Sequence, residues 1–314
     1  MGRCSRDPKQ IKMPKDPKSK KRSARPNNRY ASSGGKRSNP NSPKRIDVSG
    51  RSNRGANRPS QKEHGLGGEQ IEGRQAVREL LLGQRRRVRE IWIASDIEAS
   101  PVIDDILDLA RDQRVQVMSV SRRELEREAR SEAPQGVLAK ADEIDETLLA
   151  DLLVESRDMP LLLVAVDGVT DPGNLGAILR CCDGAGVDAV ILPRHRAVHV
   201  TPTVAKSSAG AIEYLNMCVV GGLPSALAEM KQAGVFIVGL DDAADKSIFE
   251  IGETAKESIC LVLGAEGAGM SRLARERCDL LVNIPMLGSL SSLNVSVAAA
   301  LATYEIVRSR RSNK

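Results

Sequence analysis

Aromatic residues are scarce in this 314-residue sequence, which holds one Trp, three Tyr and two Phe. Proteins that bind single-stranded nucleic acid by stacking its bases need exposed rings, so the scarcity argues against a base-stacking platform. It also means that Leu, Val, Ile and Ala must pack the interior. Hydrophobic residues make up 41% of the chain, which at this length is enough for two domains with cores of their own.

Long apolar runs are absent as well. The sequence has no stretch of about 18 apolar residues that could cross a membrane. Its N-terminus also lacks the short hydrophobic core of a signal peptide. We therefore expect a cytoplasmic protein without a membrane-spanning segment.

Motifs for metals and disulfides are missing too. The six cysteines contain no CxxC pair, and we expect them to be reduced and mostly buried: Cys4, Cys181, Cys182, Cys218, Cys260 and Cys278. There is no Walker A and no HExxH sequence. His195 and His199 have i, i+4 spacing, but no acidic residue stands beside them, so we expect no metal site.

Positive charge is concentrated at one end of the chain. Residues 1–64 hold 19 Lys and Arg against 4 Asp and Glu, whereas the rest holds 28 against 37. Because the same segment has too few apolar side chains to offset chain entropy, we predict a disordered tail. Basic segments bind phosphates by releasing counterions, which makes nucleic acid the expected partner. The alternative is a solubility tail with no partner.

Residues 68–145 alternate short helix and strand signals and predict a small α/β module. The expected elements are a helix over 75–82, a strand over 88–94, a helix over 102–111, a strand over 115–120 and a capped helix over 121–130. Six arginines gather near its start: Arg74, Arg78, Arg85, Arg86, Arg87 and Arg89. They form either an RNA-contacting surface or an ordinary solvated face.

An acidic stretch that ends at Pro160 follows, so we assign residues 146–158 to a linker and 159–314 to a second domain. The second domain contains wholly apolar short runs at 161–166, 189–192, 235–240, 259–263 and 280–284. Helical stretches accompany them at 174–184, 223–232, 272–277 and 292–308. Strands that are apolar throughout are buried on both faces, so the pattern predicts a parallel sheet covered by helices.

Glycine-rich or polar loops follow the predicted strands that end near Gly264 and Ile284, where open parallel sheets bind their ligands. If these loops meet, their backbone groups could hold a purine, and the glycines would permit close approach. Taken alone, residues 264–269 could equally be a turn before a helix. Residues 184–189 match GxGxxA, but they follow a helix and precede a strand, so we interpret them as a helix-ending turn.

Residues 167–180, 263–271 and 284–298 together resemble, in this order, the three signature motifs of the SpoU (TrmH-like) branch of the SPOUT RNA methyltransferases. The resemblance implies an α/β fold with a mostly parallel sheet and a deep trefoil knot. It also implies S-adenosyl-L-methionine as cofactor, transfer of a methyl group to a ribose 2′-hydroxyl, and a homodimer. A 2′-hydroxyl target makes RNA the substrate. The apolar last helix, over 295–306, would suit either a subunit interface or a core.

The resemblance also assigns roles to particular residues. It implies polar active-site residues at Asn174, Arg180, Glu266, Ser292 and Asn294, and cofactor-contacting residues at Gly264, Ile284 and Leu293. Arg180 matches the family's activating residue. Because a guanidinium stays protonated, we expect it to bind the substrate phosphate and orient the 2′-oxygen, ahead of acting as a general base. Glu266 could position Arg180 or the ribose.

Simpler interpretations of the same residues stay open. Asn174, Ser292 and Asn294 could each cap a helix, and Arg180 and Glu266 could form a surface ion pair.

The upstream module resembles the ribosomal-protein-like RNA-binding domain of the subgroup that methylates guanosine 2′-hydroxyls in large-subunit rRNA. Residues 71–77 (IEGRQAV) resemble its GR-x-AV opening and 135–139 (QGVLA) its QG-x-x-A element, although Pro134 stands where related members often have His. The expected function is 2′-O-ribose methylation of rRNA, at a guanosine of 23S rRNA. The alternatives are a tRNA or resistance-type 2′-O-methyltransferase, and a non-catalytic RNA-binding protein of ribosome assembly.

Overall fold

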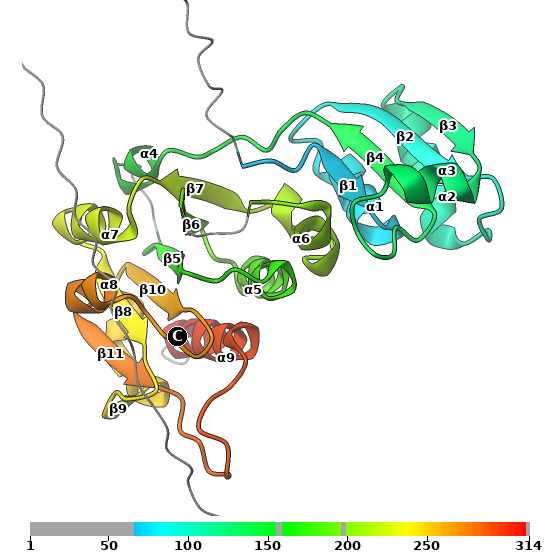
Figure 1. Cartoon of the computed structure of the whole chain (residues 1–314). Helices are drawn as coiled ribbons and strands as arrows, with labels where there is room; N and C mark the ends of the chain where they lie inside the picture. Colours follow the sequence, from blue (N-terminus) through cyan, green and yellow to red (C-terminus); the bar gives the residue numbers. More distant parts are fainter. Residues whose placement is uncertain (1–65, 155–158, 196–198, 312–314) are drawn as a thin grey trace, which may run out of the picture. The chain divides into compact units, whose positions relative to one another are not determined.

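The computed structural model describes residues 66–154, 159–195 and 199–311 (Figure 1). All of these residues belong to one compact unit. The predicted basic tail, residues 1–64, lies outside the described residues, as does the end of the predicted linker, 155–158.

The first part of the described chain is a small α/β domain built on a four-stranded sheet in the order β1-β4-β2-β3. Its strands are β1 (Gln70–Glu72), β2 (Val88–Ala94), β3 (Gln116–Val120) and β4 (Val137–Ala141). β2 pairs with β3 in parallel, whereas β4 is antiparallel to both β1 and β2. Its helices are α1 (Arg74–Gly83), α2 (Pro101–Asp112) and α3 (Arg122–Glu128).

Apolar spacing explains the predicted elements of this domain, and all five are confirmed. The buried residues of α1 are Ala76, Val77, Leu80 and Leu81, which lie on one helix face. The Ser121 side chain accepts a hydrogen bond from the backbone N–H of Glu124 and caps α3. The strands β1 and β4 were not predicted. β1 is too short to show a period, and β4 is almost wholly buried and so does not alternate.

The second part contains seven strands among the described residues, in the order β7-β6-β5-β10-β8-β11-β9, and every pairing is parallel. The strands are β5 (Leu162–Asp167), β6 (Ala189–Pro193), β7 (Asn216–Val220), β8 (Phe236–Leu240), β9 (Lys246–Ser247), β10 (Ile259–Gly264) and β11 (Leu280–Asn283). The predicted parallel sheet is confirmed. Two strands at the edges of the sheet were not predicted: β7, which begins with a polar residue and is only partly buried, and the two-residue β9.

Helices cover both faces of this sheet. They are α4 (Leu149–Val154), α5 (Pro172–Ala185), α6 (Pro202–Ser207), α7 (Leu223–Gln232), α8 (Arg272–Arg277) and α9 (Val295–Arg311), with three short 3-10 helices, η1 (Ala211–Glu213), η2 (Ile248–Glu250) and η3 (Gly252–Lys256). α4 lies in the stretch expected to be a linker. Its Leu149 and Leu152 pack in the core of the second part.

Successive residues of the central strand β5 point to opposite faces, as strand geometry requires. Leu162, Val164 and Val166 share a core with residues of α5 and α9, whereas Leu163 and Ala165 share one with residues of α7 and α8. Figure 1 accordingly shows α7 and α8 on one side of the sheet and α5 and α9 on the other. A fully apolar strand is therefore needed at this position.

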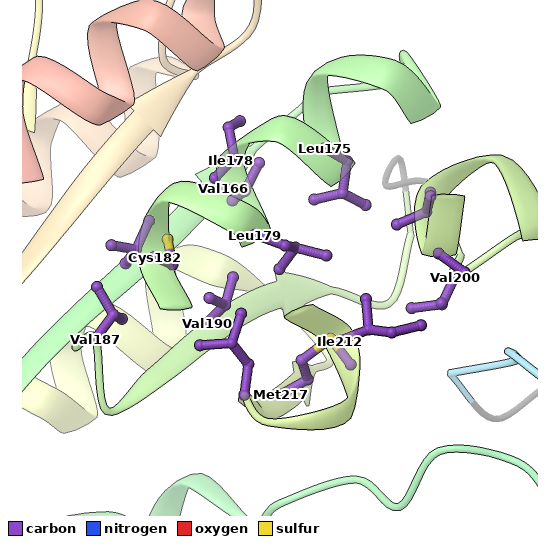
Figure 2. Close-up of a cluster of buried hydrophobic side chains, with 14 of the residues drawn as sticks. Val166, Leu175, Ile178, Leu179, Cys182, Val187, Val190, Val200, Ile212 and Met217 are labelled. Atoms are coloured by element: carbon purple, nitrogen blue, oxygen red, sulfur yellow. The ribbon is translucent and has the colours of Figure 1, made fainter. Parts of the chain in front are cut away.

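The core beneath α5 shows how its sequence sets its orientation (Figure 2). Leu175, Ile178, Leu179 and Cys182 recur at helical spacing and are all buried. The helix ends at Gly186, whose φ of 72° is left-handed, so the prediction of a helix-ending turn is confirmed. This packing fixes where the N-terminus of α5 meets the end of β5.

The described cysteines are unpaired, and most are buried as expected. Cys182, Cys218 and Cys260 are buried, while Cys181 and Cys278 are partly exposed. Burial raises the pKa of the Cys182 and Cys260 thiols well above the usual range, which keeps them uncharged.

None of the helices in the described part of the chain has the length and apolarity to cross a membrane.

Candidate active site

Three loops meet beyond the carboxyl ends of the parallel strands and enclose a hollow of about 710 Å³. They follow β8, β10 and β11 respectively, and the last of them leads into α9. The wall is formed by residues 240–243, 263–270 and 291–295, together with Arg275 and Ala298. Its volume falls in the range of small-molecule sites, roughly 300–1,000 Å³.

Gly264 ends β10 and allows the next loop to fold back onto the strand. The backbone N–H of Ala265 donates to the carbonyl of Gly269 at 3.0 Å, and the N–H of Gly269 donates back to Ala265 at 2.8 Å. A Cβ on residue 264 would lie only 2.8 Å from the Gly269 carbonyl oxygen and closer still to the backbone of Met270. Only glycine fits at this position without moving the loop.

A polar cluster joins the three sequence motifs. Oε1 of Glu266 accepts hydrogen bonds from Nδ2 of Asn294 at 2.6 Å and from Nδ2 of Asn174 at 3.2 Å. Nδ2 of Asn294 also lies 2.9 Å from Oδ1 of Asn174. The three residues come from positions up to 120 apart in the chain, so their meeting depends on the sheet order.

Two local caps place the asparagines of this cluster. The Asp171 carboxylate accepts from the backbone N–H of Asn174 at 2.7 Å, so Asp171, and not Asn174, caps α5. The side chain of Asn294 does cap α9, because its Oδ1 accepts from the backbone N–H of Ser296 at 2.9 Å. Asn294 therefore both starts the helix and binds Glu266.

The last helix begins later than predicted. We expected it from residue 292, but α9 starts at Val295, since the Asn294 cap fixes its first turn. Ser292 and Leu293 consequently stay in the loop and line the hollow together with Gly264. Ser292 is exposed and lies two residues before Asn294, the residue that caps α9, so Ser292 is not the cap of this helix.

Two of the expected site residues lie apart from this group. Ile284 follows β11 and packs against the main core, and it is not among the residues that line the hollow. Arg180 lies on α5, six residues after Asn174, with its side chain exposed. It makes no ion pair with another described residue, so the alternative of an Arg180–Glu266 surface pair is wrong.

Charged residues missed by sequence analysis also line the hollow. Asp241 and Asp242 follow β8 directly, and Asp241 pairs with Arg275 at 2.9 Å. With Glu266, the wall carries three carboxylates and one guanidinium, so it favours a cationic ligand. Their place at the carboxyl end of an apolar run was a usable signal, because ligands bind at that edge of the sheet.

No metal cluster is found in the described ranges, where no three His, Cys, Asp or Glu side chains come together in a suitable way. The polar groups of the site are side-chain amides, carboxylates, serine hydroxyls, the Arg275 guanidinium and backbone groups.

The fold and the site define a class, an α/β enzyme with a ligand hollow at the carboxyl edge of a parallel sheet. Residues 161–304 match the SpoU rRNA Methylase family, and residues 70–147 match the family described as RNA 2′-O ribose methyltransferase substrate binding. The chain belongs to the SpoU rRNA methylase family.

Its relatives include the 23S rRNA (guanosine-2′-O-)-methyltransferase RlmB of Pseudomonas aeruginosa, with 42% identity over 77% of this chain and 97% of that protein. The enzyme of the same description from Ralstonia nicotianae is 41% identical over 76% of this chain and 94% of its own. Among solved structures, the SpoU methyltransferase AviRb of Streptomyces viridochromogenes, in complex with the cofactor AdoMet, has a TM-score of 0.65 and 29% identity. The match covers 78% of this chain and 91% of that chain.

Proposed function

We propose that this protein methylates rRNA, transferring a methyl group from S-adenosyl-L-methionine to the 2′-hydroxyl of a guanosine in 23S rRNA. The observation that carries the proposal is the cluster of Asn174, Glu266 and Asn294 at the edge of the hollow, which unites the three SpoU motifs. The substrate follows from the relatives named as 23S rRNA guanosine methyltransferases.

The hollow suits the proposed cofactor in size and charge. Gly264 and Leu293 line it, as the resemblance implies, while Ile284 would act on the cofactor only through the loop that it anchors in the core. The sulfonium group is cationic, and the excess of carboxylates on the wall complements it. Backbone groups of residues 264–270 supply hydrogen-bonding partners for a purine. Bound there, S-adenosyl-L-methionine supplies a methyl group that is already electrophilic.

The chain's own residues then have to align the 2′-oxygen and help remove its proton. We assign substrate orientation to Asn174, Asn294 and Ser292, with Glu266 fixing the two amides. Arg180 is exposed and unpaired in the described structure, so its guanidinium is free to bind a phosphate of the RNA. Held beside the reacting ribose in this way, Arg180 orients the 2′-oxygen and stabilises the alkoxide as it forms.

A homodimer is part of the proposal, and α9 supplies a surface for it. Val297, Leu301 and Tyr304 follow each other at helical spacing and are 48%, 41% and 49% exposed. An exposed apolar stripe on an otherwise packed helix suits a subunit interface. Light scattering should give the mass of a dimer for the wild type and a lower mass for Leu301→Lys.

The proposed location is the cytoplasm, where rRNA is available as substrate.

The test is mass-spectrometric mapping of ribose methylation on 23S rRNA and tRNA incubated with S-adenosyl-L-methionine. We expect one 2′-O-methylguanosine in 23S rRNA with the wild type and none with Arg180→Ala. Arg272→Ala is the matched control, since Arg272 is 77% exposed and pairs only with Glu276 of its own helix. Methylation of tRNA alone would support the first alternative. Absence of both methylation and cofactor binding would support the non-catalytic RNA-binding protein.

A further inference from the structure

The arginines near the start of the small domain do not form one solvated face. Arg78 pairs with Asp105 and Arg89 with Asp142, both within the small domain. Arg85 and Arg86, by contrast, reach residues of the second domain. The segment 211–216, which they contact, includes η1 and the start of β7.

Arg86 forms a buried ion pair with Glu213. Its Nε donates to Oε2 of Glu213 at 2.9 Å and its Nη2 to Oε1 at 2.6 Å, which is the paired geometry that guanidinium and carboxylate groups favour. The two side chains are only 4% and 3% exposed. The remaining nitrogen, Nη1, donates to the carbonyls of Gly68 at 2.5 Å and Asp142 at 2.7 Å.

Those two carbonyls mark where the chain enters and leaves the small domain. Gly68 precedes β1 and Asp142 follows β4. One guanidinium therefore holds both connections of the small domain and a carboxylate of the catalytic domain. Four of its five N–H groups meet acceptors on three separate segments, so only one relative orientation of the two domains satisfies them.

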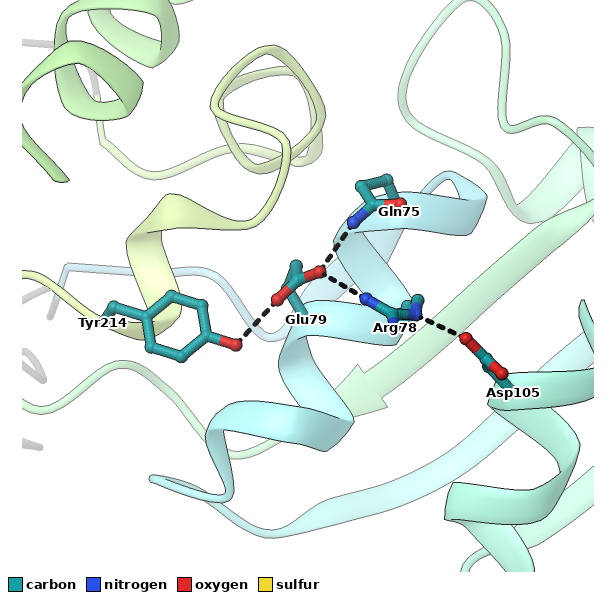
Figure 3. Close-up of polar contacts among 5 residues, drawn as sticks. All are labelled: Gln75, Arg78, Glu79, Asp105 and Tyr214. Atoms are coloured by element: carbon teal, nitrogen blue, oxygen red, sulfur yellow. Dashed lines mark hydrogen bonds and ion pairs between the residues drawn. The ribbon is translucent and has the colours of Figure 1, made fainter. Parts of the chain in front are cut away.

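Neighbouring contacts strengthen the same junction. Nη1 of Arg85 donates to the carbonyl of Tyr214 at 2.9 Å. The hydroxyl of Tyr214 in turn donates to Oε2 of Glu79 on α1 at 2.7 Å (Figure 3). Gly210 permits this approach, because a Cβ there would collide with the side chain of Glu79. The contact between α1 and the segment before β7 is thus tight as well as polar.

A buried ion pair is a poor device for stability alone, since desolvation of both charges offsets their attraction. It is an effective device for orientation, because any slip leaves a charge buried without a partner. An apolar contact would tolerate sliding that this pair does not. The junction therefore fixes the small domain in one position on the catalytic domain.

We propose that Arg86 and Glu213 are positioning residues for methyl transfer, which hold the RNA-binding domain at the distance and angle that bring the target ribose to the active site. The inference rests on the proposed rRNA methyltransferase function. RNA bound to the small domain has its target nucleotide delivered at a high effective concentration only while the junction is rigid. A displacement of about 1 Å at the reacting group can cost 100-fold in rate.

The test compares Arg86→Met and Glu213→Gln with the wild type in single-turnover methylation of 23S rRNA at saturating cofactor and RNA. We expect the rate to fall at least tenfold in both variants. Affinity for S-adenosyl-L-methionine should stay within about twofold, since the hollow is lined by other residues, and affinity for the rRNA within about threefold. The matched control is Arg111→Gln, which breaks an exposed ion pair with Asp108 inside the small domain and should leave all three quantities unchanged.

A covalent link separates positioning from folding. A Cβ on residue 83 would lie 3.2 Å from the Cβ of Glu213, close to the spacing of about 3.5–4.5 Å in disulfides. In the triple variant Arg86→Met, Gly83→Cys, Glu213→Cys, the oxidised form should methylate rRNA at least tenfold faster than the reduced form. Peptide mass mapping confirms the bond.

Each outcome decides the matter. The positioning role is refuted if the wild type methylates rRNA and the two single variants do so at the same rate. It is also refuted if oxidation of the triple variant does not raise its methylation rate. If the single variants lose cofactor affinity together with rate, they have damaged the catalytic fold, and the triple variant alone decides. If the wild type methylates no RNA, the proposed function itself fails.

Discussion

Replacement of Gly264 by alanine tests whether the loop after β10 forms the cofactor site. Gly264 pairs with Asp167 in the sheet, so its backbone cannot move without disturbing β5. The new methyl group would lie 2.8 Å from the carbonyl oxygen of Gly269 and nearer still to adjoining backbone atoms. Since the strand is fixed and the loop is more exposed, the loop must yield.

The cost can be estimated from this geometry. Overpacking by one methyl group against backbone costs about 1–3 kcal/mol. The loop residues that must move, 265–270, all line the hollow, so we expect the cost to appear in cofactor binding. At about 1.4 kcal/mol per tenfold change, the dissociation constant for S-adenosyl-L-methionine should rise about 5- to 150-fold.

Isothermal titration calorimetry measures this constant, and thermal unfolding checks the fold. Gly221→Ala is the control, because a Cβ at residue 221 meets nothing within 4 Å and its φ is not left-handed. It should bind the cofactor like the wild type. A folded Gly264→Ala protein with cofactor affinity within twofold of wild type would refute the assignment of this hollow as the cofactor site.

Three further predictions follow from the polar contacts. Glu266→Gln keeps the size of the side chain but removes the charge that both asparagine amides contact. The single-turnover methylation rate should therefore fall about tenfold, which corresponds to about 1.4 kcal/mol, while cofactor affinity stays within threefold of wild type. An unchanged rate would exclude the cluster from catalysis. Asp171→Ala removes the side chain that caps α5 by accepting a hydrogen bond from the backbone N–H of Asn174. The free energy of unfolding should fall by about 1 kcal/mol, which thermal unfolding would show as a drop of about 2–4 °C in Tm. An unchanged Tm would mean that water replaces the cap. Burial and the hydrogen bond to Glu79 raise the pKa of Tyr214 to about 12, above its ordinary value. Its contribution to stability is therefore present below about pH 10 and lost as the pH rises toward 12. In denaturant titrations between these pH values, the free energy of unfolding should fall less steeply with pH for Tyr214→Phe than for the wild type, and equal slopes would contradict this reasoning.

The helix and strand pattern was largely accessible from the sequence because it is set by local periodicity. The five apolar runs of the second domain became β5, β6, β8, β10 and β11, since side chains buried on both faces must be apolar. The start of α9 could not be predicted from the sequence pattern. It depends on an Asn294 side chain that also binds Glu266, a partner 28 residues away. The trefoil knot stays a prediction from the resemblance.

The sequence by itself determined the family and the candidate site, because three motifs in a fixed order carry residue types that the chemistry needs. The motifs named Asn174, Glu266 and Asn294 as neighbours, and the three side chains do meet; the apolar runs likewise predicted the parallel sheet. Only the tertiary structure decided what the charged residues do. Arg86 meets Glu213, 127 positions away, inside a domain junction, while Arg180 remains exposed on α5, apart from the polar cluster. Local periodicity reports which residues are buried, but the partner of a charge depends on contacts between distant segments, which no local pattern records.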